Sequence, residues 1–428
     1  MRILAACAIA FGSLAGPAFA ADSPPSRERM QGWRDRFERH VKENILAFWL
    51  KHDIDEARGG FHGALDREGR ADLNAERSLV LNARLLWTFS AASRMFPDPA
   101  YRVAAKRSYD YLMEKFRDPM RGGGFFWSVS ANGRIADDHK YLYGQSFLIY
   151  GMTEYWLMSG EPNLQKRIFT FFHQFDLPAH DRLNGGYMEA FTRNWKPELK
   201  VDPIGPPDQK SANTHLHLLE SLTSLCNATG HKLVRERLAE IRTLFLTRLT
   251  DPSGYTHEYF KPDWTPVTFD SSYGHDVELA WLLPEANRAL RIPENDPATV
   301  KLSKALVDHA LHFGFDNVRG GFFERGPANA TASDRSKNWW AQAEGLVGLL
   351  EVYRMTGDPA YFAKFEATAE FVLRDLADAQ YGEWYPGVKA DGALVGTEKA
   401  SFWKCPYHNS RACLEVIRRL DAFLARTR

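Results

Sequence analysis

Gly59-Gly60-Phe61-His62-Gly63 is the first of six short glycine–aromatic motifs that recur along the chain. The other five are Arg121-Gly122-Gly123-Gly124-Phe125-Phe126-Trp127, Asn184-Gly185-Gly186-Tyr187-Met188-Glu189, Ser253-Gly254-Tyr255-Thr256-His257-Glu258, Arg319-Gly320-Gly321-Phe322-Phe323-Glu324 and Tyr381-Gly382-Glu383-Trp384-Tyr385. Counting from Gly60, the steps to Gly123, Gly186, Gly254, Gly321 and Gly382 are 63, 63, 68, 67 and 61 residues. Each motif is usually preceded by Asp or Asn and followed by an aromatic residue, which is typical of a tight turn that enters a short strand. Such a period predicts a repeat architecture.

Two apolar-periodic stretches lie between successive motifs. In the first interval they run from Leu79 to Met95 and from Ala100 to Phe116, separated by Pro97 and Pro99. A pair of helices cannot bury its apolar faces alone, so the six units must pack on one another, and ring closure hides both ends. We therefore predict an all-α fold, an (α/α)6 barrel of six helix-pair repeats with short glycine–aromatic β-turn or hairpin connections, in one domain over residues 21–428. The alternative is an open helical solenoid, although solenoid repeats are usually shorter, about 20–45 residues.

The first residues have the pattern of a secretory signal. Arg2 supplies the positive charge, residues 3–15 are mainly apolar, and Ala18-Phe19-Ala20 forms a small-x-small cleavage site. We expect a cleavable signal peptide over residues 1–20 and an exported, periplasmic protein. A lipoprotein signal ending at Cys7 is the alternative, although the apolar segment before Cys7 is short for that role. No later stretch is long and apolar enough to predict a membrane span.

Composition limits the classes of partner. Lys and Arg together number 54, as do Asp and Glu, so no bulk attraction to nucleic acid or to an anionic membrane is expected. Beyond the signal, Cys226, Cys405 and Cys413 are an odd and sparse set, which indicates no disulfide framework. The spacing of Cys405 and Cys413 does not suit a zinc site, and no HExxH motif occurs. An aromatic content of 13% suits a sugar-binding cleft, although a large helical core also absorbs aromatic residues. We expect a small saccharide as the partner, and a monomer or weak homodimer.

Polar and aromatic residues recur early in the helix that follows each motif. Each cluster begins about 18 to 27 residues after its turn glycine. The same phase in a closed ring means the same end of the barrel, so the inner helices should aim these residues into one pocket. The candidate site residues are Arg84, Tyr143, Asn213, His217, His275, Glu278, Trp339, Trp340, Glu344, Trp403 and His408.

Histidines are the candidates for proton transfer. His275 falls at a helix start, where unpaired N–H groups favour an anion, and Glu278 follows on the same face. His275 and His408 lie on different helices and suit paired acid/base work near neutral pH. His217 rather than His215 should face the pocket, because it lies four residues after Asn213. The neighbouring Trp339 and Trp340 are not expected to point inward together, so at least one should lie in the core or at the rim.

Several motifs together resemble those of the N-acylglucosamine 2-epimerase superfamily, and its cellobiose 2-epimerase branch most. They are Leu81-Asn82-Ala83-Arg84-Leu85-Leu86-Trp87, Tyr143-Gly144-Gln145-Ser146-Phe147, Asn213-Thr214-His215-Leu216-His217, Gly274-His275-Asp276-Val277-Glu278, Trp339-Trp340-Ala341-Gln342-Ala343-Glu344 and Trp403-Lys404-Cys405-Pro406-Tyr407-His408-Asn409-Ser410-Arg411. The resemblance implies an (α/α)6 barrel and metal-free, cofactor-free epimerisation at C2 of a reducing-end sugar. It places His275 and His408 at the acid/base positions, and Trp403 at that of a sugar-contacting tryptophan. The other residues that it implies for the pocket are Arg84, Tyr143, Asn213, His217, Glu278, Trp340 and Glu344.

The predicted activity is interconversion of C2 epimers of a cellobiose- or lactose-type β-1,4 disaccharide, or a related sugar, through a cis-enediolate. The export signal departs from the family pattern and leaves the physiological sugar open. An aldose–ketose isomerase of the mannose/fructose type would share the first proton transfer. A glycoside hydrolase or lyase would use Glu278 and Glu344. In a non-catalytic glycan-binding protein, the aromatic residues would bind and the histidines would be incidental.

Overall fold

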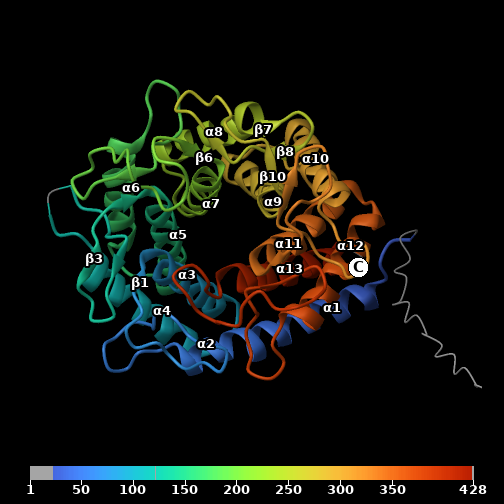
Figure 1. Cartoon of the computed structure of the whole chain (residues 1–428), viewed down its shortest axis with the longest axis horizontal. Coiled ribbons are helices and arrows are strands. Elements are labelled where there is room, and N and C mark those ends of the chain that lie inside the picture. The colour runs from blue at the N-terminus through green and yellow to red at the C-terminus, as the bar shows by residue number, and fades with distance from the viewer. Residues whose placement is uncertain (1–22, 121, 427–428) are drawn as a thin grey trace, which may run out of the picture.

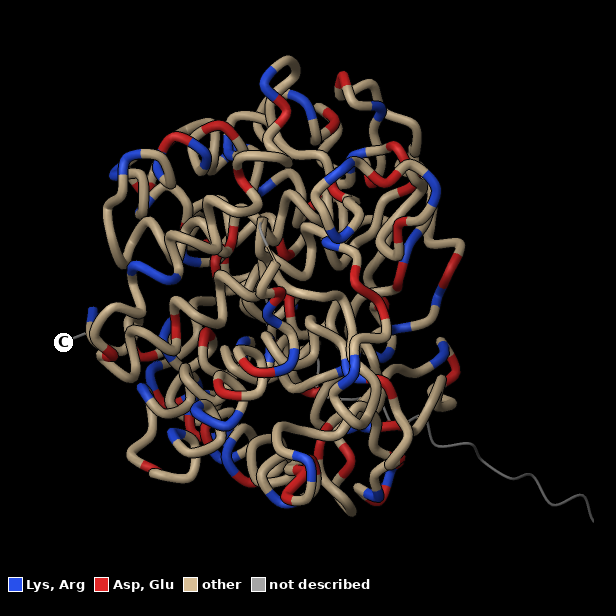
Figure 2. Tube along the Cα trace, turned by 90° about the vertical axis from the view of Figure 1, so that its left-hand side faces the viewer, with Lys and Arg blue, Asp and Glu red and all other residues tan. Residues whose placement is uncertain are grey.

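The computed structural model describes residues 23–120 and 122–426. The predicted signal peptide, residues 1–20, lies outside the described residues. Within those that are described, no helix has both the length and the apolar character needed to cross a membrane. Basic and acidic residues are interspersed along the trace in Figure 2, in line with their equal numbers.

Six helices form a closed inner ring (Figure 1). Each packs on the next in chain order, and the last packs on the first. The predicted (α/α)6 barrel is therefore confirmed, and an open solenoid is excluded by the contact between α13 and α3. The inner helices are α3 (Leu79–Met95), α5 (Leu142–Ser159), α7 (Ala212–Thr229), α9 (Tyr273–Leu290), α11 (Trp339–Thr356) and α13 (Tyr407–Arg426).

An outer helix covers each inner one. Three of the outer helices begin at an Asp-Pro pair, in which the Asp carboxylate caps the first N–H groups and Pro occupies a position whose N–H has no helical partner. The N-terminal helix α1 packs on α13 and so joins the two ends of the chain. The outer elements are α1 (Arg27–His40) with η1 (Val41–Leu46) and α2 (Ala47–His52), α4 (Pro99–Tyr111) with η2 (Leu112–Phe116), α6 (Leu164–Ala179), α8 (Lys232–Leu244) with η3 (Phe245–Leu249), α10 (Pro297–Phe313), and α12 (Pro359–Phe371) with η4 (Val372–Leu376), the η segments being π-helical.

Short antiparallel strands connect each unit to the next. The strand in front of an inner helix pairs with the hairpin of the following unit, in β1–β2, β4–β5, β6–β9, β10–β11 and β12–β13. A bridge between Leu65 and Ala400 completes this circle between the sixth and first units. The strands are β1 (Arg77–Ser78), β2 (Ser128–Val129), β3 (Ile135–Asp137), β4 (Lys140–Tyr141), β5 (Ala190–Phe191), β6 (Lys210–Ser211), β7 (Thr250–Asp251), β8 (Tyr255–Thr256), β9 (Tyr259–Phe260), β10 (Asp270–Ser272), β11 (Arg325–Pro327), β12 (Lys337–Asn338) and β13 (Gly387–Val388).

The glycine–aromatic motifs are tight turns that precede these hairpins, as predicted, and each is closed by a short antiparallel bridge or by the β7–β8 pair. Gly60 has φ 66, and a Cβ there would lie 2.5 Å from the Tyr111 ring, so both conformation and space require glycine. Asp55 accepts hydrogen bonds from the N–H groups of Ala57 and Arg58, which fixes the turn.

Buried ion pairs tie five of the six turns to the chain just before the inner helix. The pairs are Arg77–Asp55, Lys140–Asp118, Lys210–Asp181, Lys337–Asp316 and Lys399–Asp378. The fourth unit differs, because Ser271 stands where the others have a cation. Ser271 Oγ donates to Asp276 Oδ2 at 2.6 Å, and Asp276 Oδ1 accepts from the Thr256 N–H at 2.8 Å. This unit carries His275.

Candidate active site

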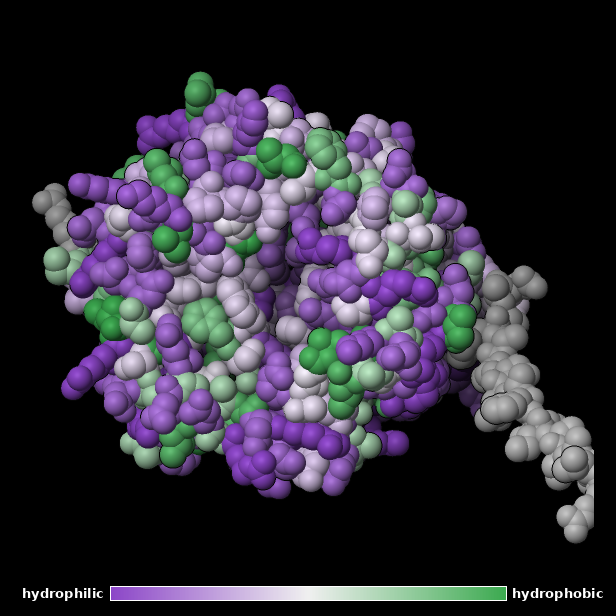
Figure 3. Space-filling view, viewed as in Figure 1, coloured by the Kyte–Doolittle hydropathy of each residue, from purple (hydrophilic) through white to green (hydrophobic). Residues whose placement is uncertain are grey.

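The N-terminal turns of the inner helices surround a cavity of about 170 Å³. Ten of the eleven residues singled out in the sequence line it: Arg84, Tyr143, Asn213, His217, His275, Glu278, Trp339, Trp340, Trp403 and His408. The eleventh, Glu344, is buried and hydrogen-bonded to His408. The space-filling view shows a recess near the centre of the ring (Figure 3).

A common register of the inner helices brings these side chains together. Arg84, Phe147, His217, Glu278 and Glu344 are each the sixth residue of their helix. Arg411 is the fifth residue of α13, which begins at Tyr407 after Pro406. Contacts among these residues, described below, also join helices that are not neighbours in the ring.

Three cavity histidines each have Nδ1 beside a carboxylate. His275 Nδ1 lies 3.3 Å from Glu258 Oε1, and His408 Nδ1 lies 2.6 Å from Glu344 Oε1. His217 Nδ1 lies 3.1 Å from Glu220 Oε2. In each case the other ring nitrogen, Nε2, is left for the cavity, where its neutral form can accept a proton.

Trp340 contacts both of the histidines predicted to transfer protons. Its ring centroid is 4.8 Å from that of His275 and 5.9 Å from that of His408. Trp339 also lines the cavity and packs against the core, which agrees with the prediction that at least one of the two tryptophans lies in the core or at the rim. They are the first two residues of α11, and at the mouth of the barrel neighbouring side chains of a first turn can reach the same opening.

A buried guanidinium holds the floor of the site together. Arg411 Nη2 donates to Glu278 Oε1 and to Glu344 Oε1, both at 2.7 Å, and Arg411 Nη1 pairs with Glu220. Glu344 Oε2 also accepts from Trp281 Nε1 at 3.0 Å. Three helices are thereby tied to α13 through one side chain.

Burial sets the protonation of the histidines. It lowers the pKa of His408 well below the usual value, and the positive charges of Arg84 and His275 add to the effect. Burial also lowers the pKa of His217, with Arg84 and His408 contributing. Both rings are therefore neutral near pH 7, the form that a general base requires.

Burial has the opposite effect on the carboxyl groups. It raises the pKa of Glu278 to about 8, and burial together with repulsion from Glu278 raises the pKa of Glu344. Two carboxylates that share one guanidinium nitrogen compete for its charge, so the pair retains a proton near neutral pH.

Arg84 faces the cavity from the first inner helix. Its Nη2 donates to Tyr143 Oη at 2.9 Å and its Nη1 to the Trp403 carbonyl at 3.2 Å. The guanidinium lies 4.1 Å from the centroid of the Phe147 ring, which fixes its plane from one side. Arg84 is hydrogen-bonded to residues of two other units of the ring. Its positive charge and N–H donors are therefore held at a defined position in the cavity.

Comparison with known proteins identifies the family. The family model described as N-acylglucosamine 2-epimerase (GlcNAc 2-epimerase) matches residues 59–412. The chain belongs to this family.

Relatives in the family include two cellobiose 2-epimerases. That of Bacteroides fragilis is 32% identical over 394 residues, which cover 90% of this chain and 98% of the relative. The structure of the enzyme from Spirochaeta thermophila has 35% identity and a TM-score of 0.84, covering 93% of this chain and 99% of the other. A D-mannose isomerase of Marinomonas mediterranea is 25% identical over 399 residues, covering 90% and 96% of the two chains. The chain is thus a sugar 2-epimerase or isomerase of the N-acylglucosamine 2-epimerase family.

In this epimerase-family site, His217 rather than His215 faces the cavity, as its spacing from Asn213 indicated. His215 is used in structure: its Nε2 accepts from the Tyr187 N–H at 3.0 Å. Two charged residues of the site were missing from the candidate set, Glu258 and Glu220, and Arg411 was present in the last motif without an assigned role. The spacing of Glu220 three residues after His217 was a usable signal. Glu258 lies on a hairpin, and no periodicity connects it to His275.

The acidic residues of the family site could be mistaken for a metal centre. One ligand atom from each of Glu278, Glu344 and His408 lies within 4.8 Å of the others. The guanidinium of Arg411 already supplies the cation here, since its Nη2 contacts both carboxylates. We therefore assign this cluster as an ion-pair network.

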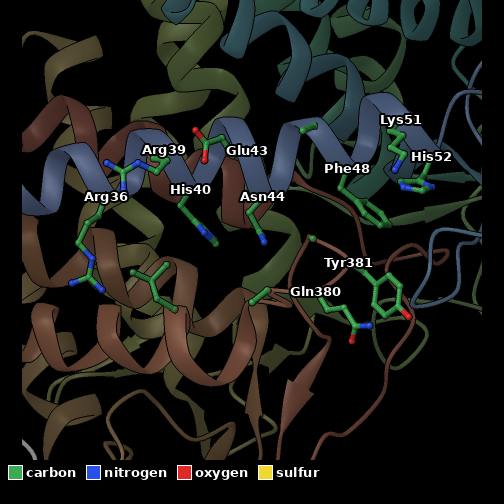
Figure 4. A pocket seen from close by; sticks show the side chains of 14 residues that line it. Arg36, Arg39, His40, Glu43, Asn44, Phe48, Lys51, His52, Gln380 and Tyr381 are labelled. Carbon is green, nitrogen blue, oxygen red and sulfur yellow. The ribbon is translucent and has the colours of Figure 1, made fainter.

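A larger groove, of about 540 Å³, lies outside the ring between the N-terminal helices and the sixth hairpin (Figure 4). His40, which lines it, accepts a hydrogen bond from Trp384 Nε1 at 2.7 Å, and burial lowers its pKa to about 4. That histidine has a structural role, and no residue of the candidate site lines this groove.

Proposed function

We propose that the protein is a cofactor-independent 2-epimerase that interconverts C2 epimers at the reducing end of a β-1,4-linked disaccharide of the cellobiose or lactose type. The observation that carries the proposal is the presence of His275 and His408 in one cavity, each in ring contact with Trp340. Epimerisation requires removal of a proton from one face of C2 and its return to the other, which two separate histidines can perform.

The proton transfers that epimerisation requires define the roles of the two histidines. Ring opening exposes the C1 carbonyl and makes the C2 proton acidic. One histidine, neutral at Nε2, takes that proton and becomes imidazolium, which leaves a cis-enediolate. The intermediate turns about its C2–C3 bond, and the second histidine donates a proton to the opposite face. In the direction that begins with neutral His408 the donor is His275 as imidazolium, and the reverse direction runs the same steps backwards. Solvent exchange then restores both rings.

The negative charge on the enediolate oxygens must be stabilised where it forms. Arg84, already held by Tyr143 and the Trp403 carbonyl, offers its remaining N–H groups to the oxygens. The N-termini of the inner helices that meet at the cavity add a positive potential. We assign Tyr143, Asn213, His217, Trp339, Trp340 and Trp403 to sugar binding, because their side chains line the same space.

Two other activities remain as competing proposals, with unequal support. An aldose–ketose isomerase would form the same enediolate and protonate C1, and the D-mannose isomerase among the relatives favours keeping that activity as the second candidate. A glycoside hydrolase would need two carboxyl groups about 5–9 Å apart across the scissile bond. Glu278 and Glu344 instead share Arg411 Nη2, and Glu344 lies behind His408, so this arrangement does not suit hydrolysis.

Reaction in D2O tests the proposal. Cellobiose, lactose, mannose and glucose would be incubated with the enzyme and the products analysed by NMR and mass spectrometry. We expect deuterium at C2 of the product epimer, because a histidine base exchanges its proton with solvent. A labelled ketose would establish the isomerase instead, and release of glucose from cellobiose would establish a hydrolase.

Alanine variants identify the two bases. His275→Ala and His408→Ala should each lose epimerisation by about 10²–10⁴-fold, the usual contribution of a positioned acid or base. His312→Ala, which removes an exposed histidine on α10, is the matched control and should keep the parental rate. Parental activity in either active-site variant would contradict the two-histidine mechanism.

We also propose export to the periplasm with cleavage after Ala20, on the pattern of residues 1–20. N-terminal sequencing of the protein recovered from a periplasmic fraction should begin at Ala21. The proposed monomer or weak homodimer is tested by light scattering over a range of concentrations.

A further inference from the structure

Glu258 is the acidic neighbour that the sequence did not connect with His275. It follows β8 in the fourth hairpin, whereas His275 is the third residue of α9. The Glu258 side chain is 11% exposed and that of His275 is 16% exposed, so both are shielded from bulk water. His275 Nδ1 lies 3.3 Å from Glu258 Oε1.

A second contact anchors Glu258 from the other side. Arg325, at the start of β11 in the fifth hairpin, has Nη1 3.3 Å from Glu258 Oε2. β11 pairs with β10, the strand that leads directly into the helix of His275. The β10–β11 pair therefore fixes the imidazole relative to the anchoring guanidinium, and Glu258 reaches both from the connection between β8 and β9.

The charge state of Glu258 decides which nitrogen of His275 carries the proton. Burial opposes ionisation, but the hydrogen bond with His275 and the positive charges of His275 and Arg325 prevail and lower the pKa of Glu258. An ionised carboxylate only accepts hydrogen bonds, so Nδ1 must be the donor in this contact. Neutral His275 then has its lone pair on Nε2.

We propose that Glu258 is the positioning residue of His275, holding the ring as the Nδ1–H tautomer so that Nε2 exchanges the C2 proton with the sugar. The inference rests on the proposed epimerase function and adds to it a residue outside the cavity lining. The same carboxylate stabilises the imidazolium that His275 must become when it acts as the acid. The Glu344–His408 contact does the same for the second base, which gives the two histidines equivalent partners from different units.

Another acidic group, Glu324, also lies near His275 but does not contact its Nδ1. Glu324, in the fifth hairpin, has an Oε2 that is buried and makes no hydrogen bond to the residues that the structure describes. Burial raises the pKa of Glu324, and the charge of His275 opposes that rise. Glu324→Gln therefore removes an acidic group from the same surroundings and leaves the Nδ1 contact intact, which makes it the matched control.

The test combines kinetics with the exchange of hydrogen at C2. Glu258→Gln should lower kcat by about 10²–10⁴-fold while KM changes little, because the carboxylate does not touch the sugar. In D2O, deuterium should still enter the substrate epimer that His408 deprotonates, and exchange from the epimer that His275 deprotonates should fall with kcat. The basic limb of the pH profile should move down by about one pH unit, because the imidazolium has lost its partner. Glu324→Gln should reproduce none of these changes.

A measurement on the parental protein does not depend on any variant of Glu258. Its His275 nitrogen shifts, from NMR of 15N-labelled protein and assigned with His275→Gln, should show the Nδ1–H tautomer. A His275 in the Nε2–H form would overturn the proposal even if Glu258→Gln did not fold. So would equal losses in Glu258→Gln and Glu324→Gln, or parental kinetics in Glu258→Gln. Failure of the parental enzyme to place deuterium at C2 of any sugar would instead count against the proposed function.

Discussion

Glu278 differs from the neighbouring Glu344 in how its two oxygens are used. Glu344 accepts hydrogen bonds on both oxygens, from Arg411 and His408 on Oε1 and from Trp281 on Oε2. Glu278 accepts from Arg411 on Oε1, and its Oε2 finds no partner within the described part of the chain. The proton that this pair retains therefore belongs on Glu278 Oε2, where it becomes a donor at the cavity wall.

We predict that Glu278→Gln keeps kcat within about tenfold of the parent, whereas Glu278→Ala loses about 10²-fold or more. Glutamine replaces the neutral carboxylic acid by a neutral amide that still donates one hydrogen bond, and alanine leaves Arg411 without an oxygen partner on that side. The measurement is steady-state epimerisation at pH 7. Equal losses in the two variants would mean that the ionised carboxylate is the active form.

The same residue predicts how stability depends on pH. Because the pKa of Glu278 is raised to about 8, the unfolded chain releases this proton first as pH rises from about 4.5 to 8, and the folded state loses stability across that window. Urea unfolding at about pH 5, 6.5 and 8 should therefore show a smaller fall for Glu278→Gln than for the parent. An identical slope in both proteins would place the proton elsewhere.

Sequence predicted the residues of the cavity more fully than the contacts among them. Repeat phase and the i+4 spacing from Asn213 were enough to favour His217, because both depend on one helix. The partner of His275 is on a hairpin, so its identity depends on how a loop folds back on the barrel. Arg411 was visible in the last motif, yet its role depends on three helices that converge only in the closed ring.

At the scale of elements, two glycines let inner helices approach closely. A Cβ at Gly348 of α11 would lie 2.5 Å from the Val277 carbonyl oxygen of α9, and one at Gly151 of α5 would lie 2.5 Å from the Ala83 oxygen of α3. The obstructing atoms belong to helix backbone and cannot move aside. These contacts set the spacing between neighbouring inner helices and thereby the width of the site.

We predict that Gly348→Ala destabilises the protein by about 1–2 kcal/mol. Alanine favours a helix over glycine by about 1 kcal/mol, but overpacking against fixed backbone costs about 1–3 kcal/mol and prevails. Gly32→Ala in α1 is the control: no atom lies within 4 Å of its added Cβ, so propensity alone acts and stability should rise. Chemical denaturation of both variants provides the measurement, and a stabilised Gly348→Ala would show that α9 and α11 separate readily.

The elements themselves were largely predictable, and their lateral connections were not. The repeat period, the glycine turns and the apolar-periodic stretches are local signals, and they placed the helix pairs and the turns between them. Strands of two or three residues carry no alternation to read, so the pairing of each unit with the hairpin of the next was not foreseen. The buried cation before five inner helices, such as Lys337 beside Asp316, looked like an ordinary polar residue, because its burial comes from the neighbouring unit.

On the scale of the whole molecule, closure of the ring decides how stability is distributed. The contacts of α13 with α3 and with α1, and the bridge between Leu65 and Ala400, leave no terminal unit in the barrel. In an open array the end repeats can unfold separately, since each contacts only its neighbours. A ring without ends has no such site from which unfolding can start, so the six units should unfold together.

Trp33 provides the test of this cooperativity. It lies on α1, packs its ring against Phe37 and Phe365, and donates from Nε1 to Glu366 at 2.8 Å. We predict that Trp33→Ala lowers the free energy of unfolding by about 3–5 kcal/mol, the cost of removing a buried aromatic side chain. The amides of α7 lie on the far side of the ring from the contact between α1 and α13 (Figure 1). Because the ring is closed, the slowest-exchanging of them should lose as much protection as those of α13. Hydrogen exchange followed by mass spectrometry measures both, with Val103→Ala, a truncation at a residue that is 65% exposed, as the control. Loss of protection confined to α1, α12 and α13, with α7 at its parental value, would mean that the units unfold one by one as in an open solenoid.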